Sequence, residues 1–160
     1  MEFHMENKIS NWGNYPMIDG ELFKISAKEQ ARSLLNDCDA VIARGMGRCY
    51  GDSSLASKML GMPSYNRIAA FDSRTGAITC QAGVTIAELL EIFAPRGWFP
   101  PVTPGTKFVT VGGAVAADIH GKNHHQEGSF CHYVDKIELM LASGETIKCF
   151  RDPLGDLWVN

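Results

Sequence analysis

Two glycine-rich stretches and a histidine-rich segment carry the residues of this chain that are best suited to chemistry. The first stretch spans residues 44–52 (RGMGRCYGD), and the second spans residues 104–114 (PGTKFVTVGGA) and leads into HGKNHH at 120–125. Glycine lets backbone N–H groups turn toward an anion without a side chain in the way. Two such loops can hold one diphosphate from both sides. The pattern therefore predicts a site for a large phosphate-bearing cofactor.

The spacing of the first stretch argues against two common nucleotide-binding folds. A short apolar run at 40–43 precedes it, so its glycines are expected where a buried strand ends. Glycines at 45, 47 and 51 do not match the GxGxxG spacing of a Rossmann fingerprint, and no glycine precedes Lys-Ser or Lys-Thr as in a P-loop. Either stretch alone could be an ordinary turn. Both stretches together with the histidine segment favour a binding site.

The elements expected around these stretches form one mixed α/β unit. In chain order they are a helix over about 27–36, a strand at 40–43, a β-hairpin over 67–82, a helix capped by Thr85 and closed by Gly97, a helix beginning near Gly112, and a hairpin over 134–150. Ser26 and Glu29 have the spacing of a capping box for the first helix. Because helices and strands do not alternate strictly, a doubly wound sheet is disfavoured.

The composition of the chain argues against several classes of protein. Apolar residues make up 45% of the 160 residues and charged residues 21%, as in one globular domain with a sizeable core. A net charge of −3 with dispersed lysines and arginines argues against nucleic acid as a partner. No apolar run reaches the roughly 18 residues of a membrane span. Five scattered cysteines without a CxxC argue against a disulfide framework and predict a cytoplasmic protein with reduced thiols.

The motifs RGMGRCYGD, PGT, TVGGAVAADIHGKNHH and GSF resemble the flavin-binding half of FAD-linked oxidoreductases of the vanillyl-alcohol-oxidase superfamily, from about Trp12 to about Cys149. The resemblance implies an α+β fold, the PCMH-type FAD-binding domain, with mixed sheets and flanking helices. Members of this family are much longer. Residues 12–160 are therefore interpreted as the N-terminal part of such a domain, truncated before the substrate domain, and residues 1–11 as a tail or cloning remnant.

The resemblance assigns FAD to the glycine-rich stretches. The diphosphate is expected to bind backbone amides from both, and small residues at 112–117 would let the flavin ring pack closely or would simply permit tight helix packing. In many relatives a histidine of the first loop bonds covalently to the flavin, but Arg48 and Cys49 stand there, so FAD is expected to be non-covalent. The expected cofactor residues are Gly45, Met46, Gly47, Arg48, Cys49, Tyr50, Pro104, Gly105, Thr106, Thr110, Gly112, Gly113, Ala116, Ala117, His120, Gly121 and Asn123.

The same resemblance implies the reaction and its residues. It implies oxidation of a secondary alcohol on a sugar or sugar-lipid by hydride transfer to FAD, with a reductase as partner in a two-protein epimerase. His120 corresponds to a histidine beside the flavin ring, and Tyr50 and Lys122 correspond to positions lining the substrate pocket. We therefore expect His120, Tyr50 and Lys122 to be the catalytic residues, with His120 or Tyr50 assisting loss of the hydroxyl proton.

Two alternative interpretations belong beside this one. Three histidines within six residues, His120, His124 and His125, could bind a metal with Asp118 or Glu127, but they lack the i, i+4 spacing of helical zinc sites and Lys122 lies between them. No metal is therefore predicted. The chain could also be a non-catalytic domain that keeps the flavin fold and serves as a scaffold or interaction module.

Overall fold

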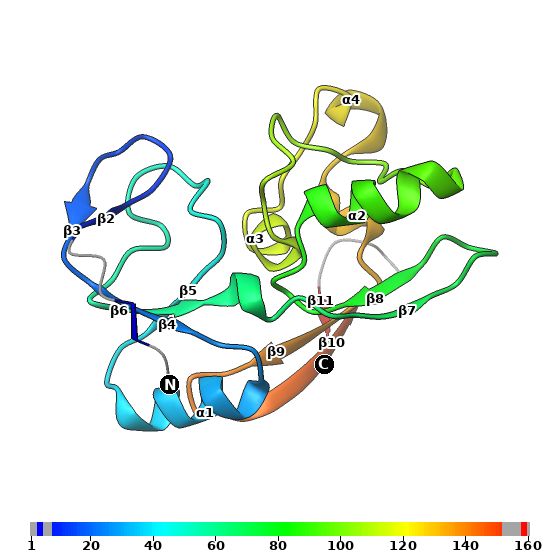
Figure 1. Cartoon of the computed structure of the whole chain (residues 1–160). Coiled ribbons are helices and arrows are strands. Elements are labelled where there is room, and N and C mark those ends of the chain that lie inside the picture. Colours follow the sequence, from blue (N-terminus) through cyan, green and yellow to red (C-terminus); the bar gives the residue numbers. More distant parts are fainter. Residues whose placement is uncertain (1–2, 5–7, 152–157, 160) are drawn as a thin grey trace.

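The computed structural model describes residues 3–4, 8–151 and 158–159 of the chain. In this part, the strands form four sheets, and the elements gather in two groups (Figure 1). The N-terminal sheet lies on the left of the figure with α1 (Lys28–Asp37) below it, and α2 (Ile86–Phe93), α3 (Val111–Ala116) and α4 (His124–Glu127) lie on the right. The strands β9 (Lys136–Met140) and β10 (Thr146–Arg151) run from beside α1 toward the underside of the right-hand group.

The N-terminal sheet places the first glycine-rich stretch at the end of a strand. Its strand order is β1 (Phe3–His4), β4 (Glu21–Lys24), β6 (Lys58–Gly61) and β5 (Ile42–Arg44). Both β4 and β5 run parallel to β6, while β1 is antiparallel to β4. The strand expected at 40–43 is therefore present, shifted toward the glycines. A hairpin of β2 (Ile9–Ser10) and β3 (Met17–Ile18) precedes β4.

Helix α1 (Lys28–Asp37) connects β4 to β5 and confirms the expected helix. Its buried residues Ala31 and Leu34 pack with Phe23, Ile25 and Leu60 in one core cluster. Through this cluster α1 covers one face of the parallel strands and holds them in place.

The predicted capping box of α1 is wrong in its residues. The N-cap is Ala27 rather than Ser26, and the partner is Gln30 rather than Glu29. The Gln30 side-chain oxygen accepts the amides of Ser26 at 2.8 Å and Ala27 at 3.2 Å. Because a neutral amide oxygen reaches both preceding N–H groups, the helix starts one residue later than the sequence pattern indicated.

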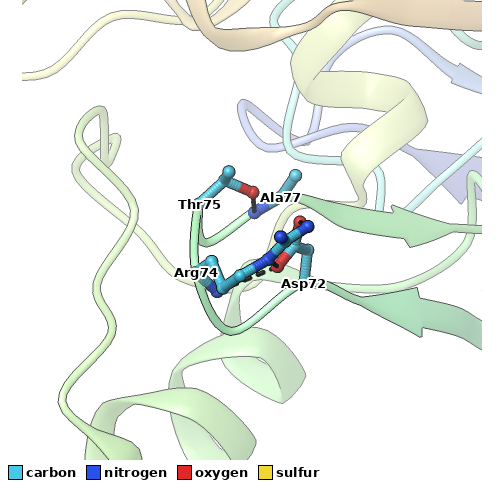
Figure 2. Close-up of polar contacts among 4 residues, drawn as sticks. All are labelled: Asp72, Arg74, Thr75 and Ala77. Carbon is cyan, nitrogen blue, oxygen red and sulfur yellow. Dashed lines mark hydrogen bonds and ion pairs between the residues drawn. The ribbon is translucent and has the colours of Figure 1, made fainter.

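The hairpin expected at 67–82 is present as β7 (Ile68–Phe71) and β8 (Ile78–Cys80). Figure 2 shows its turn, in which the Asp72 carboxylate accepts the Arg74 amide at 2.9 Å. The Thr75 hydroxyl accepts the Ala77 amide at 3.3 Å. Short polar side chains that bond their own backbone two residues on stabilise such turns.

Helix α2 (Ile86–Phe93) packs on this hairpin and confirms the Thr85 cap. The Thr85 hydroxyl accepts the Glu88 amide at 3.2 Å, and the Glu88 carboxylate accepts the Thr85 amide at 2.7 Å. A 3-10 turn, η2 (Ala94–Arg96), follows, and Gly97 ends it at φ +84°. Buried Val84, Ile86, Leu89 and Phe93 form the second core cluster, against Phe71 and Ile78 among others.

The remaining elements carry the rest of the predicted site. They are α3 (Val111–Ala116), α4 (His124–Glu127), the 3-10 turns η1 (Met62–Ser64) and η3 (Phe130–Tyr133), and the strands β9 (Lys136–Met140), β10 (Thr146–Arg151) and β11 (Trp158–Val159). Strands β9 and β10 form the hairpin expected at 134–150. This hairpin contacts α1, because Arg32 Nε donates to the Gly144 carbonyl at 2.9 Å and Lys28 pairs with Glu138. Within the described residues, no helix is both long and apolar enough to cross a membrane.

Candidate cofactor site

The two glycine-rich stretches meet at Gly45 and Thr110. Gly45 directly follows β5, and Thr110 is the N-cap of α3. A Cβ added at Gly45 would lie 2.4 Å from Thr110 Oγ1, so only glycine permits this approach. In Figure 1, α3 lies on the side of its group that faces the loop after β5. The fold therefore brings together two stretches that are about 60 residues apart in the sequence.

The first loop presents unused backbone donors. In the described part of the chain, the amides of residues 46–50 have no intramolecular acceptor. Gly47 and Gly51 adopt φ values of +61° and +58°, which favour glycine and turn the backbone sharply. A turn with successive unpaired N–H groups is a typical anion-binding concavity. The residues present therefore fit a diphosphate group at this loop.

The glycine amides of the second stretch have acceptors, unlike those of the first loop. This corrects the prediction that Gly112 and Gly113 offer their amides to the diphosphate. The Gly112 amide donates to the Ala82 carbonyl at 2.8 Å, and the Gly113 amide donates to Thr110 Oγ1 at 3.2 Å. Gly112 and Gly113 therefore do not offer free amides to a diphosphate, because helix capping and the contact with residues 82–84 engage them. A Cβ at Gly112 would lie 2.8 Å from the Ala82 Cβ, so this glycine serves close packing.

The loop at 104–106 remains open. A Cβ at Gly105 would have no neighbour within 4 Å, and the Thr106 hydroxyl accepts the Phe108 amide at 3.2 Å. Just beyond this loop, the Val109 carbonyl accepts the Ile86 amide at 3.0 Å, which ties the second stretch to the start of α2. An accessible turn is thus formed by Pro104, Gly105 and Thr106, and the residues that follow it are held in place by the start of α2.

The histidine-rich segment packs against residues 101–103, which directly precede the second stretch. A Cβ at buried Gly121 would lie 2.6 Å from the Thr103 carbonyl oxygen, and Asn123 Nδ2 donates to the Pro101 carbonyl at 3.0 Å. His120 pairs with Ser129 in an isolated antiparallel bridge. The predicted cofactor residues Gly121 and Asn123 therefore anchor the segment to residues 101–103 rather than to the first loop.

The three predicted catalytic side chains are exposed and do not contact one another. Tyr50 is 77% exposed at the end of the first loop, and His120 and Lys122 are exposed on the histidine segment. Among the described residues, no hydrogen bond or ring contact joins these three side chains. The ring of His120 instead lies near that of His124, with ring centroids 5.2 Å apart. Ala116 and Ala117, at the end of α3, are also exposed.

Asp118 organises the backbone on which His120 lies. Its carboxylate accepts the Cys131 amide at 2.9 Å, and Phe130 donates its amide to the Ile119 carbonyl at 2.8 Å. Burial raises the pKa of Asp118, but hydrogen bonds from Cys131 and Ser129 outweigh it and leave that pKa below its ordinary value. Sequence reasoning considered Asp118 only as a metal ligand. Its position two residues before His120 is the signal for this supporting role.

The cysteines near the site differ in environment. All five cysteines are free thiols. Cys49 Sγ lies 3.1 Å from the Ser54 hydroxyl. Burial, with a hydrogen bond to Asp118, raises the pKa of Cys131 to about 11, so this thiol is neutral at pH 7.

The histidines lack a metal-binding arrangement within the described residues. No group of three or more His, Cys, Asp or Glu side chains is close enough there to hold a metal ion. The His124 ring nitrogen Nδ1 lies 3.2 Å from the Gly121 carbonyl, and His132 Nδ1 accepts the Ser129 amide at 3.0 Å. These histidines therefore make local hydrogen bonds.

Sequence reasoning missed the polar residues beneath the first loop. Asn11 is 3% exposed and binds both Arg44 and the Gly51 carbonyl. Ile9 is also buried, so residues 9–11 pack with the domain. Nothing in the local pattern around Asn11 reveals these contacts, because its partners are 33 and 40 residues away in sequence.

Comparison with known proteins agrees with this geometry. A family model described as "FAD binding domain" matches residues 24–149. Over 107 residues the chain is 49% identical to decaprenylphosphoryl-beta-D-ribose oxidase of Mycolicibacterium smegmatis, covering 66% of this chain and 23% of that protein. It is 31% identical over 90 residues to D-lactate dehydrogenase of Anaerostipes hadrus, covering 56% of this chain and 19% of that protein.

A third relative is the mitochondrial D-2-hydroxyglutarate dehydrogenase of Danio rerio, 32% identical over 85 residues, or 52% of this chain and 16% of that protein. The chain thus spans less than a quarter of the length of these relatives. The family match covers most of the chain, and the mixed sheets and helices agree with the α+β, PCMH-type fold. The chain therefore belongs to the FAD-binding domain family.

Proposed function

We propose that this chain supplies part of the FAD site of an oxidoreductase that oxidises a secondary alcohol of a sugar or sugar-lipid. The observation that carries the cofactor assignment is the first glycine loop, whose amides at residues 46–50 have no acceptor in the described chain. The substrate class is supported by the 49% identity to a decaprenylphosphoryl-beta-D-ribose oxidase.

The proposed FAD contacts follow from which donors are available. Amides of Met46, Gly47, Arg48, Cys49 and Tyr50 would hold the diphosphate, and the open turn at 104–106 would approach it from the other side. Thr110, Gly112 and Gly113 would contribute by letting α3 lie against this loop. Cys49 contacts Ser54, and no histidine lies in the loop, which supports non-covalent FAD.

His120 is the proposed residue that receives the hydroxyl proton. When bound, FAD supplies a ring that accepts a hydride from the carbon bearing the hydroxyl. In the described structure the His120 ring nitrogens make no hydrogen bond, whereas His124 and His132 each bond a neighbouring backbone group. A ring nitrogen of His120 is therefore available to accept the proton. Tyr50 from the first loop and Lys122 from the histidine segment are proposed to bind the substrate.

We also propose a reductase partner, as the sequence resemblance implies, and a cytoplasmic setting. The five free thiols support the reducing compartment. The partner would reduce the oxidised sugar, so that the two proteins together invert one hydroxyl-bearing carbon.

A chimera tests the function directly. The 107 matched residues of this chain would replace their counterparts in the Mycolicibacterium smegmatis oxidase. We expect the purified chimera to retain FAD, and its bound FAD to be reduced by that enzyme's sugar-lipid. His120→Ala in the chimera should leave FAD bound and slow flavin reduction at least about a hundredfold, the lower end of the range for loss of a positioned acid–base group.

The control is His125→Ala, which removes a neighbouring exposed histidine from the same segment. It should leave flavin reduction unchanged. A folded chimera that purifies without FAD would contradict the cofactor assignment. Retained FAD with no reduction by the sugar-lipid would contradict the substrate class, and would favour the domain as a non-catalytic flavin-fold scaffold.

A further inference from the structure

A polar cluster lies beneath the first glycine loop and joins three segments of the chain. It consists of Arg44 at the end of β5, Asn11 from the N-terminal segment, and Ser54 after the loop. Arg44 NH1 donates to Asn11 Oδ1 and to the Ser54 hydroxyl at 3.2 Å, and NH2 donates to the Ser10 carbonyl at 2.7 Å. The Ser54 hydroxyl donates to Asn11 Oδ1 at 3.1 Å.

The central side chain of the cluster is buried, and both its oxygen and its nitrogen have hydrogen-bond partners, while Arg44 and Ser54 are half-buried. Asn11 is 3% exposed, its oxygen accepts from Arg44 and Ser54, and its Nδ2 donates to the Gly51 carbonyl at 2.9 Å. Buried polar groups of this kind stabilise one geometry, because losing any partner leaves another group unsatisfied.

The cluster also explains why Gly47 is glycine. A Cβ there would lie 2.4 Å from Arg44 NH2, and φ is +61°. The guanidinium thus fills the underside of the turn, and the chain above it has to be bare backbone.

The decisive observation is that several carbonyls of the loop are held, while the amides of residues 46–50 have no acceptor among the described residues. The Cys49 carbonyl accepts the Trp12 amide at 3.2 Å, Asn11 holds the Gly51 carbonyl, and Arg48 NH1 holds the Met46 carbonyl at 2.8 Å. In a planar trans peptide the N–H points opposite to the C=O. Holding the carbonyls of Met46 and Cys49 therefore turns the N–H groups of Gly47 and Tyr50 the other way.

We propose that Arg44, Asn11 and Ser54 are positioning residues for the loop amides, so that residues 10–12, ahead of the family match at 24–149, help to form the cofactor site. Asn11 binds the Gly51 carbonyl, Arg44 lies beneath Gly47, and Ser54 contacts the Cys49 thiol. All three would therefore act on FAD only through the loop. The identification of FAD as the ligand rests on the proposed function. The ordering of the loop by these three residues does not depend on it.

The test compares adjacent serines in the chain without FAD. Ser54→Ala removes a hydroxyl of the cluster, and Ser53→Ala removes an exposed hydroxyl that binds only the Tyr50 carbonyl. Backbone ¹⁵N relaxation would give order parameters for residues 46–50. We expect rigid values of about 0.85 in the wild type and in Ser53→Ala, and values below about 0.6 in Asn11→Ala, with Ser54→Ala between them.

Arg44→Lys separates geometry from charge. Lysine keeps the positive charge but lacks the planar fork that reaches Ser10, Asn11 and Ser54 together. We expect it to loosen the loop as Asn11→Ala does, and to weaken FAD binding about tenfold, the order of size of one lost hydrogen bond to a charged group. Ile78→Val, which removes a methylene from the second core cluster in the β7–β8 hairpin, controls for lost stability and should leave the loop's order parameters unchanged.

The outcomes are distinct. Wild-type order parameters at residues 46–50 in Ser54→Ala and Arg44→Lys would overturn the inference, even if Asn11→Ala fails to fold. Failure of the wild-type chain to bind FAD would instead contradict the proposed function, because the order parameters are measured without FAD.

Discussion

At the scale of single residues, the contact between Gly45 and Thr110 makes the joining of the two stretches testable. Gly45→Ala would place a methyl group 2.4 Å from Thr110 Oγ1. We expect the free energy of unfolding to fall by about 1–3 kcal/mol, as for overpacked sites, and FAD binding to weaken. Urea unfolding and a flavin fluorescence titration would measure both.

Gly105 provides the matched control for that substitution. It lies in the other glycine-rich stretch, and an added Cβ there has no neighbour within 4 Å. Gly105→Ala should change stability by less than about 0.5 kcal/mol. Equal losses in the free energy of unfolding for Gly45→Ala and Gly105→Ala would show that Gly45 and Thr110 are not packed as described.

Asp118 gives the site a dependence on pH. Its pKa is lowered in the folded chain, because hydrogen bonds from Cys131 and Ser129 outweigh the effect of burial. A lowered carboxyl pKa means that its stabilising contribution is complete above the unfolded pKa, near 3.8, and is lost as pH falls through the folded pKa below that value. Asp118→Asn should therefore be less stable than wild type at pH 7, and the difference should shrink below about pH 4.

Urea unfolding at pH 7, 5 and 3 would check this prediction. Asp19→Asn, which changes an exposed carboxylate, serves as the control. A stability difference for Asp118→Asn that is the same at all three pH values would contradict the role of the ionised carboxylate.

At the scale of elements, the cap of α2 positions the strand-like segment before α3. Thr85 caps α2 and also pairs with Thr110 in an isolated bridge. Thr85→Ala should lower the free energy of unfolding by about 1 kcal/mol, the usual effect of losing a threonine cap. Thr75→Ala, which removes a hydroxyl from the exposed β7–β8 turn in Figure 2, should change it by less than about 0.5 kcal/mol.

Thermal and urea unfolding of both threonine variants would measure the difference. If Thr75→Ala lowers the free energy of unfolding as much as Thr85→Ala does, the capping box does not make the contribution to stability that is assigned to it.

Elements with strong local signals were predictable from the sequence. Helix α2 has a threonine cap, a glutamate three residues later and apolar residues at helical spacing, and it lies where these signals place it. The hairpin of β7 and β8 follows from its two short, largely apolar runs and the polar turn between them. The start of α1 was misplaced by one residue, because Gln30 rather than Glu29 reaches back to the amides of Ser26 and Ala27, and the sequence offers both as capping partners.

At the scale of the whole molecule, long-range arrangement was beyond the sequence pattern. The order β1-β4-β6-β5 depends on parallel pairing between strands that α1 and the first glycine loop separate. The glycines correctly marked the stretches that meet at Gly45 and Thr110. They did not reveal that the Gly112 and Gly113 amides are engaged while those of residues 46–50 are not, because that depends on contacts with Ala82 and on the folded cap.

The same arrangement defines how the chain would hold FAD. The proposed diphosphate donors lie on the N-terminal group of elements, and the open turn at 104–106 and His120 lie on the other. Weak binding by the 160-residue chain is expected, because the chain matches only 23% of the length of its Mycolicibacterium smegmatis relative.

The most direct test is to follow the backbone amide NMR signals of the chain as FAD is added to millimolar concentration, where weak binding is still detected. The account predicts saturable shifts centred on residues 46–50, with smaller shifts at 104–106, and their loss in Gly45→Ala. No shift at residues 46–50, or shifts centred on another surface, would contradict the claim that the first glycine loop is the diphosphate site.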